Sequence, residues 1–407
     1  MNRQIVFDIL LDFYKNNSYL NLKLKQVKSN NISSITNRVY GVITFNDYLD
    51  YLVNELVNKQ KIDLRVRVIL KMFVYEYIYL NKKEHIIVNE AVNLSNIYTK
   101  SASGFINVNL RNINKIKDLK PSFTKEEKNE EIILNTPRFI LRLLKKQYQD
   151  YNKILSTNLI NKPNYIYKVN DLEEDIYQDT IFGDIKLTNS NVIKNNDFNN
   201  NNYLITDIGS YFITQLVSEN KDSLLDMCSA PGTKSIMLKE KFNQIDANDI
   251  HPHRVNLIKD NLQKYNVSNI NMLNVDASTF NFNKVYDYIL IDAPCSGLGV
   301  IRSKPDIKYN ITLESINELK EIQYNLLVNA SKYLKRGGKI IYSTCTLNKE
   351  ENEDIVLKFM NEFNFKEIKE DKLINIAKVN KEDVGITLKN YILDSNSFYC
   401  IKMERNE

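Results

Sequence analysis

The chain has 407 residues, of which 43% are hydrophobic and 26% are charged, which is typical of a folded protein with two or three domains. No run of about 18 apolar residues occurs, and the N-terminus lacks the apolar core of a signal peptide, so we expect no membrane contact and a cytoplasmic location. Residues 1–120 hold 18 Lys and Arg against 10 Asp and Glu, a charge of +8, whereas the remainder holds 37 against 40, a charge of −3.

Residues 1 to about 115 carry a helical pattern. Val66, Ile69, Leu70 and Phe73 recur on one helical face, and residues 88–95 continue the pattern in a second helix. No alternating strand pattern competes, so we predict an all-α domain over residues 1–120. Its positive charge suits contact with the phosphates of a nucleic acid, although charge alone is equally consistent with a solvated helix surface.

Residues 121–205 are predicted to hold linker helices and then a small RNA-binding subdomain. Pro137 opens a helix, and beyond it short apolar runs such as 165–167 and 185–187 are interrupted by Asn, Asp and Gly, as in short strands. The run 195–202 is almost entirely polar and is expected to be a loop.

Residues 206–407 are predicted to form an α/β domain. Apolar runs of strand length alternate with helical segments such as 252–265, which predicts a mostly parallel sheet with helices on both faces. In such sheets, ligands bind at the carboxyl ends of the strands. The expected strands are residues 224–227, 245–248, 270–275, 288–291 and 339–342.

Three successive strand ends carry a candidate cofactor site. The first ends in a turn of small residues that leads into a helix, so that backbone N–H groups can approach a ligand. Asp249 follows the second strand, where it can accept both ribose hydroxyls of an adenosine, and Asp276 follows the third, where it can face the adenine amine. The turn consists of Cys228, Ser229, Ala230, Pro231, Gly232, Thr233 and Lys234.

The pattern of this turn limits the class of ligand. It is not the Gly-x-Gly-x-x-Gly of dinucleotide-binding proteins, and the chain has no phosphate-binding loop of the Gly-x-x-x-x-Gly-Lys-Ser/Thr type. The ligand therefore needs a ribose and an adenine but no pyrophosphate. S-adenosylmethionine fits this description.

The next two strand ends each carry a cysteine, Cys295 and Cys345, in polar turns. Carbon 5 of cytosine is a poor nucleophile, but a thiolate that adds at carbon 6 leaves an enamine whose carbon 5 can attack a methyl sulfonium. A second thiolate can then serve as the base. Asp292, three residues before Cys295, is placed to hydrogen-bond the target base at N3 or at its amine.

The remaining cysteines and the histidines do not suggest a metal site. No Cys-x-x-Cys pair occurs and the chain has three histidines, so no metal is expected, and in the cytoplasm all four cysteines should be free thiols. Cys400 lies in an apolar stretch and is expected to be a small buried hydrophobic residue.

Segments 225–234, 292–297 and 343–346 resemble the motifs of the Sun/Fmu (RsmB) family of RNA 5-methylcytosine methyltransferases, and 293–309 and 350–353 resemble the RsmB branch. The resemblance implies a Rossmann-like catalytic domain that uses S-adenosylmethionine. It also implies that Cys345 is the nucleophile, that Cys295 assists release of the product, and that Asp249, Asp276 and Asp292 surround the cofactor with the turn 228–234.

The resemblance extends to the N-terminal domain. Segments 38–41, 88–92 and 105–111, together with His85, resemble the NusB-like RNA-binding domain of RsmB proteins. The resemblance implies a cytosine of small-subunit ribosomal RNA as substrate. We expect the protein to be a monomer. Two positions and one segment depart from the family: Thr233 replaces a usual Gly, Asn109 replaces a usual Ala, and 394–399 replaces an Asp-Gly-Phe-Phe pattern.

Three other readings are weaker. A non-catalytic RNA-binding factor has no need of both cysteines and three acidic residues. An amino-group methyltransferase carries Asn/Asp-Pro-Pro-Tyr after the fourth strand, where this chain has Asp292-Ala-Pro-Cys295. A DNA cytosine methyltransferase uses the cysteine of its Pro-Cys motif and needs no second thiol.

Overall fold

The computed structural model describes residues 2–169, 178–188 and 203–406, and the predicted loop 195–202 lies outside them. The chain forms two compact units. We call them the helical unit, Met1–Ile160 with Ile301–Asn310, and the sheet unit, Asn161–Val300 with Ile311–Glu407. The predicted division at residues 120 and 205 differs from this one, because residues 121–160 join the helical unit.

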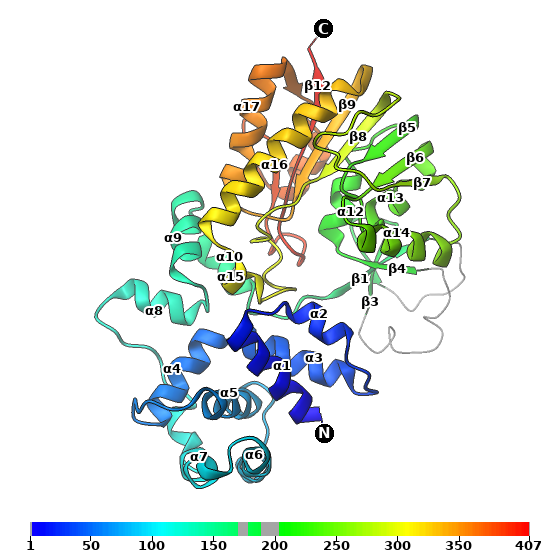
Figure 1. The fold of residues 1–407 in the computed structure, drawn as a ribbon. Coiled ribbons are helices and arrows are strands. Elements are labelled where there is room, and N and C mark those ends of the chain that lie inside the picture. The colour runs from blue at the N-terminus through cyan, green and yellow to red at the C-terminus, as the bar shows by residue number, and fades with distance from the viewer. Residues whose placement is uncertain (1, 170–177, 189–202, 407) are drawn as a thin grey trace. The chain divides into compact units, whose positions relative to one another are not determined.

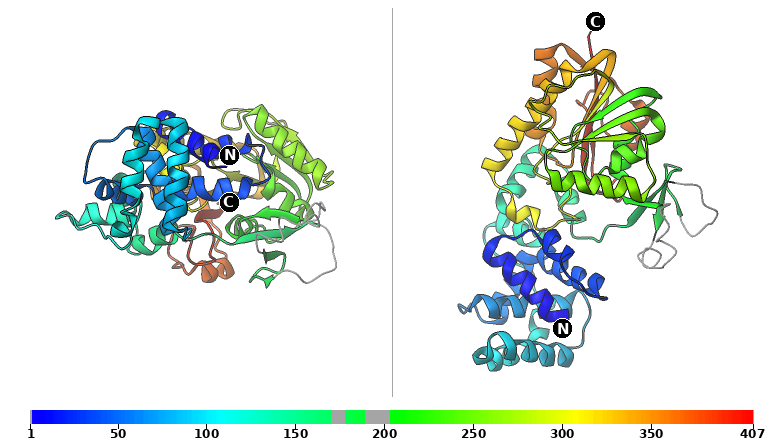
Figure 2. Two further views of the ribbon diagram at one scale, coloured as in Figure 1. Left: turned by 90° about the horizontal axis from the view of Figure 1, so that it is seen from below. Right: turned by 45° about the vertical axis from the view of Figure 1, so that its right-hand side comes forward.

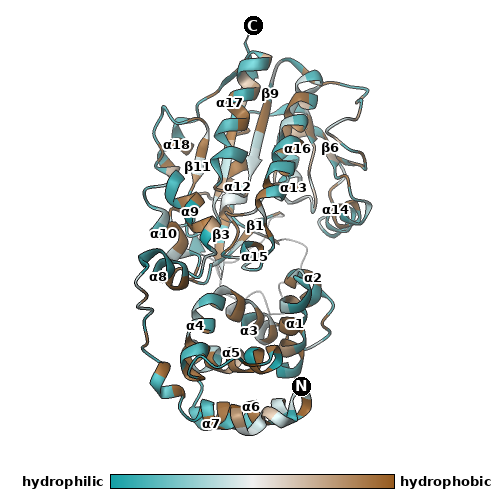
Figure 3. Cartoon of the chain, turned by 60° about the vertical axis from the view of Figure 1, so that its left-hand side comes forward, coloured by the Kyte–Doolittle hydropathy of each residue, from teal (hydrophilic) through white to brown (hydrophobic). Residues whose placement is uncertain are grey.

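The helical unit confirms the predicted all-α first domain (Figure 1). Helix α5 is at its centre, and the predicted face Val66, Ile69, Leu70 and Phe73 is buried in one core with residues of α1, α3, α4 and α6. Figure 3 shows hydrophobic and hydrophilic sides on these helices. Its helices are α1 (Asn2–Asn16), α2 (Leu20–Lys25), α3 (Ile32–Thr44), α4 (Asn46–Leu56), α5 (Leu64–Ile78), α6 (Glu84–Tyr98), α7 (Ser103–Leu110), α8 (Glu126–Ile133), α9 (Arg138–Gln147), α10 (Tyr151–Thr157) and α15 (Ile307–Asn310).

Residues 301–310 belong to the helical unit, although in the chain they lie between two segments of the sheet unit. Lys308 is 2% exposed, and its Nζ donates to the carbonyl oxygens of Thr44 at 2.9 Å and Asn135 at 2.6 Å. Burial lowers the pKa of Lys308 to about 8. Asp306 accepts a hydrogen bond from the backbone of Leu20. The prediction placed this segment in the catalytic domain; these buried contacts, distant in sequence, place it with the helices.

The sheet unit begins with a small antiparallel sheet in the order β2-β3-β1-β4. Its strands are β1 (Asn164–Lys168), β2 (Gln178–Asp179), β3 (Ile185–Thr188) and β4 (Tyr203–Thr206). The predicted runs 165–167 and 185–187 are therefore strands, as the alternation of apolar and turn-forming residues indicated.

The large sheet has eight described strands in the order β10-β12-β9-β8-β5-β6-β7, with β11 paired to β12. The five predicted strands are all present and parallel, and the order reverses at β5, which lies between β6 and β8. The antiparallel strands β10, β11 and β12 were not predicted. The bounds are β5 (Lys221–Asp226), β6 (Phe242–Asn248), β7 (Ile270–Leu273), β8 (Tyr286–Asp292), β9 (Leu334–Thr344), β10 (Phe365–Glu367), β11 (Ile386–Leu388) and β12 (Phe398–Arg405).

Helices cover both faces of this sheet, as predicted. On one face, Leu225 and Ile289 pack with residues of α16 (Leu313–Lys332) and α17 (Glu353–Phe363), which Figures 1 and 2 show side by side. The other face carries α12 (Ile208–Thr214), α13 (Thr233–Met237), α14 (Pro252–Lys264) and α18 (Asp371–Ala377). Alternate strand residues serve opposite faces because side chains alternate along a strand. Within the described ranges, no helix has the length and apolar character needed to span a membrane.

Candidate active site

The two predicted cysteines meet at the carboxyl ends of neighbouring parallel strands. Strand β8 ends at Asp292 and β9 ends at Thr344, with Asp292 opposite Ser343 in the register. The loops that follow bring the Sγ atoms of Cys295 and Cys345 to 3.3 Å from each other. Both side chains are partly exposed. The edge of the sheet thus presents two thiols in direct contact, each reachable from outside.

The contact between the two thiols is a hydrogen bond. The pKa of Cys295 lies well above its ordinary value, because Cys295 shares a hydrogen bond with Cys345 and is desolvated. Either sulfur can be the donor in this contact. The raised pKa of Cys295 is consistent with Cys295 as the protonated member, which leaves Cys345 as the candidate for the thiolate, the nucleophilic form of a cysteine.

Asp292 lies beside this pair in an ion pair that the sequence did not reveal. Its Oδ2 is 2.6 Å from Nζ of Lys234, and its Oδ1 accepts a hydrogen bond from Ser343 Oγ at 2.8 Å. Burial is the largest single influence and lowers the pKa of Lys234, but Asp292, Asp226 and Cys345 together outweigh it, so the pKa is raised. The negative charge of a Cys345 thiolate contributes to the same rise. The buried ammonium group of Lys234 thus forms an ion pair with Asp292 and interacts electrostatically with a thiolate at Cys345.

The turn after β5 contains a glycine in a left-handed conformation and leads directly into a helix. Gly232 has φ +91°, a left-handed conformation that side chains rarely adopt, and it comes directly before the first residue of α13, Thr233. The backbone N–H of Ser229 donates to the Asn248 carbonyl, and that of Gly232 to the Ser229 carbonyl. Thr233 is therefore compatible with the turn, because the left-handed residue is Gly232.

The side chain of Asn248, at the end of β6, joins two of the predicted cofactor segments. Its Nδ2 donates to the carbonyl oxygens of Met227 and Val275, and its Oδ1 accepts from the Val275 N–H at 2.9 Å. The turn 228–234 and the segment that carries Asp276 are thereby held next to each other. The sequence analysis missed this residue, although its place at a strand end was a usable signal.

The two acidic residues of this region differ in exposure. Asp249 is 2% exposed, accepts from the N–H of His251 and lies 3.3 Å from Nη1 of Arg254. Asp276 is exposed and accepts from the backbone and side chain of Ser278. A carboxylate has about four acceptor sites, so both keep capacity for a ligand.

Asp226, the last residue of β5, is a further acidic group that the sequence analysis did not single out. It is 1% exposed; its Oδ2 accepts from Ser235 Oγ at 2.6 Å, and in the described structure its Oδ1 has no hydrogen-bond partner. Burial raises its pKa to about 6. Burial and the carboxylates of Asp226 and Asp292 also raise the pKa of Cys228. Cys228 is therefore poorly suited to form a thiolate.

The C-terminal segment that departs from the family pattern supports the cysteine loops. Ser397 N–H donates to the Gly299 carbonyl, and Gly299 N–H donates to the Cys345 carbonyl, both at 2.9 Å. A Cβ at residue 299 would lie 2.3 Å from the Ser397 oxygen, so only glycine fits. Cys400, in β12, is 1% exposed, which confirms its prediction as a buried residue.

Comparisons with known proteins match both units. The model of the 16S rRNA methyltransferase RsmB/F family matches residues 213–403, and the NusB family model matches residues 1–115. A probable ribosomal RNA small subunit methyltransferase B from Bacillus subtilis (strain 168) is 31% identical over 397 residues, covering 88% of each chain. A ribosomal RNA small subunit methyltransferase F from Aliivibrio fischeri (strain MJ11) is 36% identical over 205 residues, covering 48% of this chain and 43% of that protein.

Solved structures share the fold. The crystal structure of PH0851 gives a TM-score of 0.76 at 19% identity and covers 100% of this chain and 99% of the other. A methyltransferase homolog protein from Pyrococcus horikoshii gives 0.57 at 20% identity, covering 70% of this chain and 100% of the other. Given its resemblance to the Bacillus protein over nearly its whole length, the chain belongs to the RsmB/F family of 16S rRNA methyltransferases and carries a NusB-family domain at its N-terminus.

Proposed function

We propose that this protein methylates carbon 5 of a cytosine in small-subunit ribosomal RNA through a covalent bond between Cys345 and carbon 6. The observation that carries the proposal is the contact of two thiols, 3.3 Å apart, at neighbouring strand ends. Methylation of an amino group needs no thiol, whereas carbon 5 of cytosine needs both a nucleophile and a base. The names of the relatives, which act on the RNA of the small subunit, supply the substrate class.

The cofactor of this fold and family is S-adenosylmethionine, which supplies a methyl group on a positively charged sulfur. The residues present suit such a ligand. Asp249 and Asp276 offer acceptors for ribose hydroxyls and an adenine amine, and the unpartnered Oδ1 of Asp226 is an acceptor for an ammonium group. We assign the turn Cys228–Lys234 to the same site.

Cys345 attacks as a thiolate, which Lys234 stabilises. The new bond from Sγ to carbon 6 moves the electron pair of the double bond onto carbon 5, which then takes the methyl group. The thiol of Cys295 first gives up its proton to solvent, and the resulting thiolate removes the proton from carbon 5. The double bond then returns, and the bond from carbon 6 to sulfur breaks to restore the Cys345 thiolate. The raised pKa of Cys295 makes it a stronger base in this last step.

Asp292 binds the exocyclic amine of the cytosine in this proposal. Asp292 accepts hydrogen bonds from Lys234 and Ser343, which suits the ionised, acceptor-only form. An amine donates to such a group, whereas N3 needs a donor. The amine is therefore the better of the two contacts that the sequence left open.

The RNA affinity is assigned in part to the helical unit. Residues 1–120 carry a charge of +8, and release of counterions from RNA by such a surface makes binding weaken as salt rises. The target cytosine must leave its stack to reach the thiols, so an unpaired loop or junction is the expected site.

The proposal is tested by incubating the full chain with 16S ribosomal RNA and S-adenosylmethionine and digesting the RNA to nucleosides. Mass spectrometry against standards should find 5-methylcytidine. N4-methylcytidine would refute carbon-5 chemistry, and absence of any methylated nucleoside from RNA of the intact and the assembling subunit would refute the substrate.

A further inference from the structure

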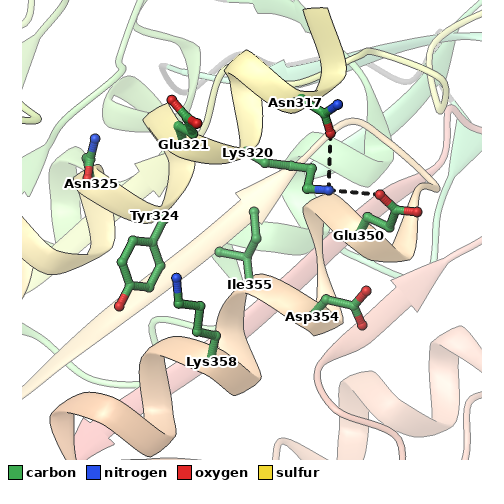
Figure 4. A pocket seen from close by; sticks show the side chains of 9 residues that line it. All are labelled: Asn317, Lys320, Glu321, Tyr324, Asn325, Glu350, Asp354, Ile355 and Lys358. Atoms are coloured by element: carbon green, nitrogen blue, oxygen red, sulfur yellow. Dashed lines mark hydrogen bonds and ion pairs between the residues drawn. The ribbon is translucent and has the colours of Figure 1, made fainter. Parts of the chain in front are cut away.

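A buried carboxylate connects the two cysteine loops. Glu351 is the last residue of a short 3-10 helix, η5 (Lys349–Glu351), six positions after Cys345, and it is 0% exposed. Its neighbour Glu350 faces the other way. Glu350 pairs with Lys320 Nζ at 2.8 Å, at a surface pocket of about 770 Å³ between α16 and α17 (Figure 4). Two adjacent glutamates thus have opposite surroundings, one inside and one at the surface.

The Glu351 carboxylate accepts hydrogen bonds from both loops. From the Cys295 loop, Ser296 donates twice, through its N–H to Oε1 at 2.8 Å and through Oγ to Oε2 at 2.6 Å. From the Cys345 loop, Asn348 Nδ2 donates to Oε2 at 3.1 Å. Gln323 of α16 donates to Oε1 at 3.2 Å and to the carbonyl of Pro294. These donors are buried, and Ser296 immediately follows Cys295.

Burial of the Glu351 carboxylate lowers the stability of the fold unless the hydrogen bonds around it compensate. Burying a carboxylate carries a large desolvation penalty, and the donors around Glu351 are neutral groups rather than a lysine or arginine. The network fixes the position of the Cys295 loop relative to the Cys345 loop. Two loops from different strands, about 50 residues apart in the chain, share one acceptor, and a shift of about 1 Å between reacting groups can lower a rate about 100-fold.

We propose that Glu351 is a positioning residue for the thiol pair: its buried carboxylate ties the loop of Cys295 to the loop of Cys345 and so fixes the contact between the two sulfur atoms. The inference rests on the proposed function for its catalytic meaning, whereas the tie between the loops does not depend on it. The charge of Glu351 also adds to the factors that raise the pKa of Cys295, after the hydrogen bond with Cys345 and burial. Glu351 therefore helps Cys295 to keep its proton.

The test compares Glu351→Gln with the matched control Glu350→Gln, both in the full chain. Glu351→Gln should lower kcat for RNA methylation between about 10-fold and 100-fold, while the Kd for S-adenosylmethionine stays within about twofold of the wild type. Glu350→Gln should leave both within about twofold. Equal kcat in the two variants would overturn the proposal, and so would a parallel loss of cofactor affinity and thermal stability in Glu351→Gln.

A second measurement follows the thiols without catalysis. Alkylation of Cys295 and Cys345 by iodoacetamide, quantified by peptide mass spectrometry across pH, should shift to lower pH for Cys295 in Glu351→Gln, because a negative charge beside it is gone. Glu351→Asp keeps the charge but shortens the reach, so it should retain the wild-type profile and still lose kcat. An unshifted profile in Glu351→Gln overturns the role of the charge. If the wild type makes no 5-methylcytidine, the proposed function fails, and the alkylation profiles still decide whether Glu351 acts on the pair.

Discussion

The carboxyl edge of the large sheet has two parts: the thiol end, after β8 and β9, carries Cys295 and Cys345, and the acidic end, after β5, β6 and β7, carries the candidate cofactor carboxylates. Different kinds of contact stabilise the two ends. After β8 and β9, the neighbours of the cysteines, Ser296 and Thr346, are buried and bonded to each other at 2.8 Å and to Glu351. After β7, Asp276 is exposed and its carboxylate accepts from Ser278, two residues further along the chain. The contacts around the cysteines join distant segments, whereas the carboxylate of Asp276 is held by a local turn.

This difference matches the demands of the two tasks. A covalent attack needs its groups in place before the substrate arrives, so the protein itself must supply the order. A bound cofactor contributes its own contacts, and an exposed acceptor such as Asp276 can adjust to it when it enters. Changes at the thiol end should therefore affect the chemistry itself, and changes at the acidic end should affect affinity or stability by smaller amounts.

The largest expected effect is that of Cys345→Ala. Without the attacking sulfur, carbon 5 stays unreactive, so methylation of 16S ribosomal RNA should fall to the background of a radioactive methyl-transfer assay. No covalent protein–RNA complex should appear on a denaturing gel. Substantial methylation by this variant would remove Cys345 from the role of nucleophile.

Cys295→Ala should separate the two halves of the reaction. The variant can still attack the base, but loss of the carbon-5 proton and release of the enzyme are impaired, so a complex with RNA should survive denaturing electrophoresis. The double variant lacking both thiols is the control and should form none. Trapping in Cys345→Ala instead would exchange the two roles.

At the acidic end, Asp226 should make the stability of the fold depend on pH. Its pKa rises from 3.8 in the unfolded chain to about 6 in the fold, so its protonated form stabilises the fold below pH 4 and this contribution is lost as pH rises through 6. The change corresponds to about 3 kcal/mol. Asparagine does not titrate, so the unfolding free energy of Asp226→Asn minus that of the wild type should increase as pH rises from 4.5 to 7.5. Thermal unfolding at a series of pH values measures this difference. A constant difference between the two proteins would show that the carboxyl does not titrate in this range.

Asp249→Ala should have the smallest effect of the four. Loss of a charged acceptor for the ribose should cost about 2 kcal/mol of affinity for S-adenosylmethionine, or about 30-fold in Kd, by titration calorimetry. Asp260→Ala, at an exposed position on α14, is the matched control and should bind as the wild type does. If the two variants bind equally well, Asp249 does not contact the cofactor.

Local patterns were enough to predict the helices of the first domain, the five parallel strands and the cysteines at their ends. Each of these depends on neighbours in the sequence: an apolar period, a short apolar run, or a turn after it. The prediction that Cys295 and Cys345 lie at adjacent strands was also correct, and the 3.3 Å contact supports it.

Contacts between distant segments could not be predicted in this way. Strand β12 has six buried residues in succession, including Lys402, so it lacks the alternation that marks a half-buried strand. The pair Lys234–Asp292 joins residues 58 positions apart, and Glu351 reaches Ser296 across 55. No local pattern distinguishes Glu351 from Glu350, since only the fold decides which one turns inward.

The placement of residues 301–310 in the helical unit has a consequence for synthesis of the chain. The helical unit takes up a segment that leaves the ribosome after most of the parallel sheet has been made, so it cannot be completed when its first 160 residues have emerged. Until residue 308 arrives, the carbonyl groups of Thr44 and Asn135 lack the ammonium group that they share in the finished fold. The last step of folding in the helical unit is thereby coupled to the appearance of residues 301–310, which follow Cys295 in the chain, and an isolated N-terminal fragment would be an incomplete domain.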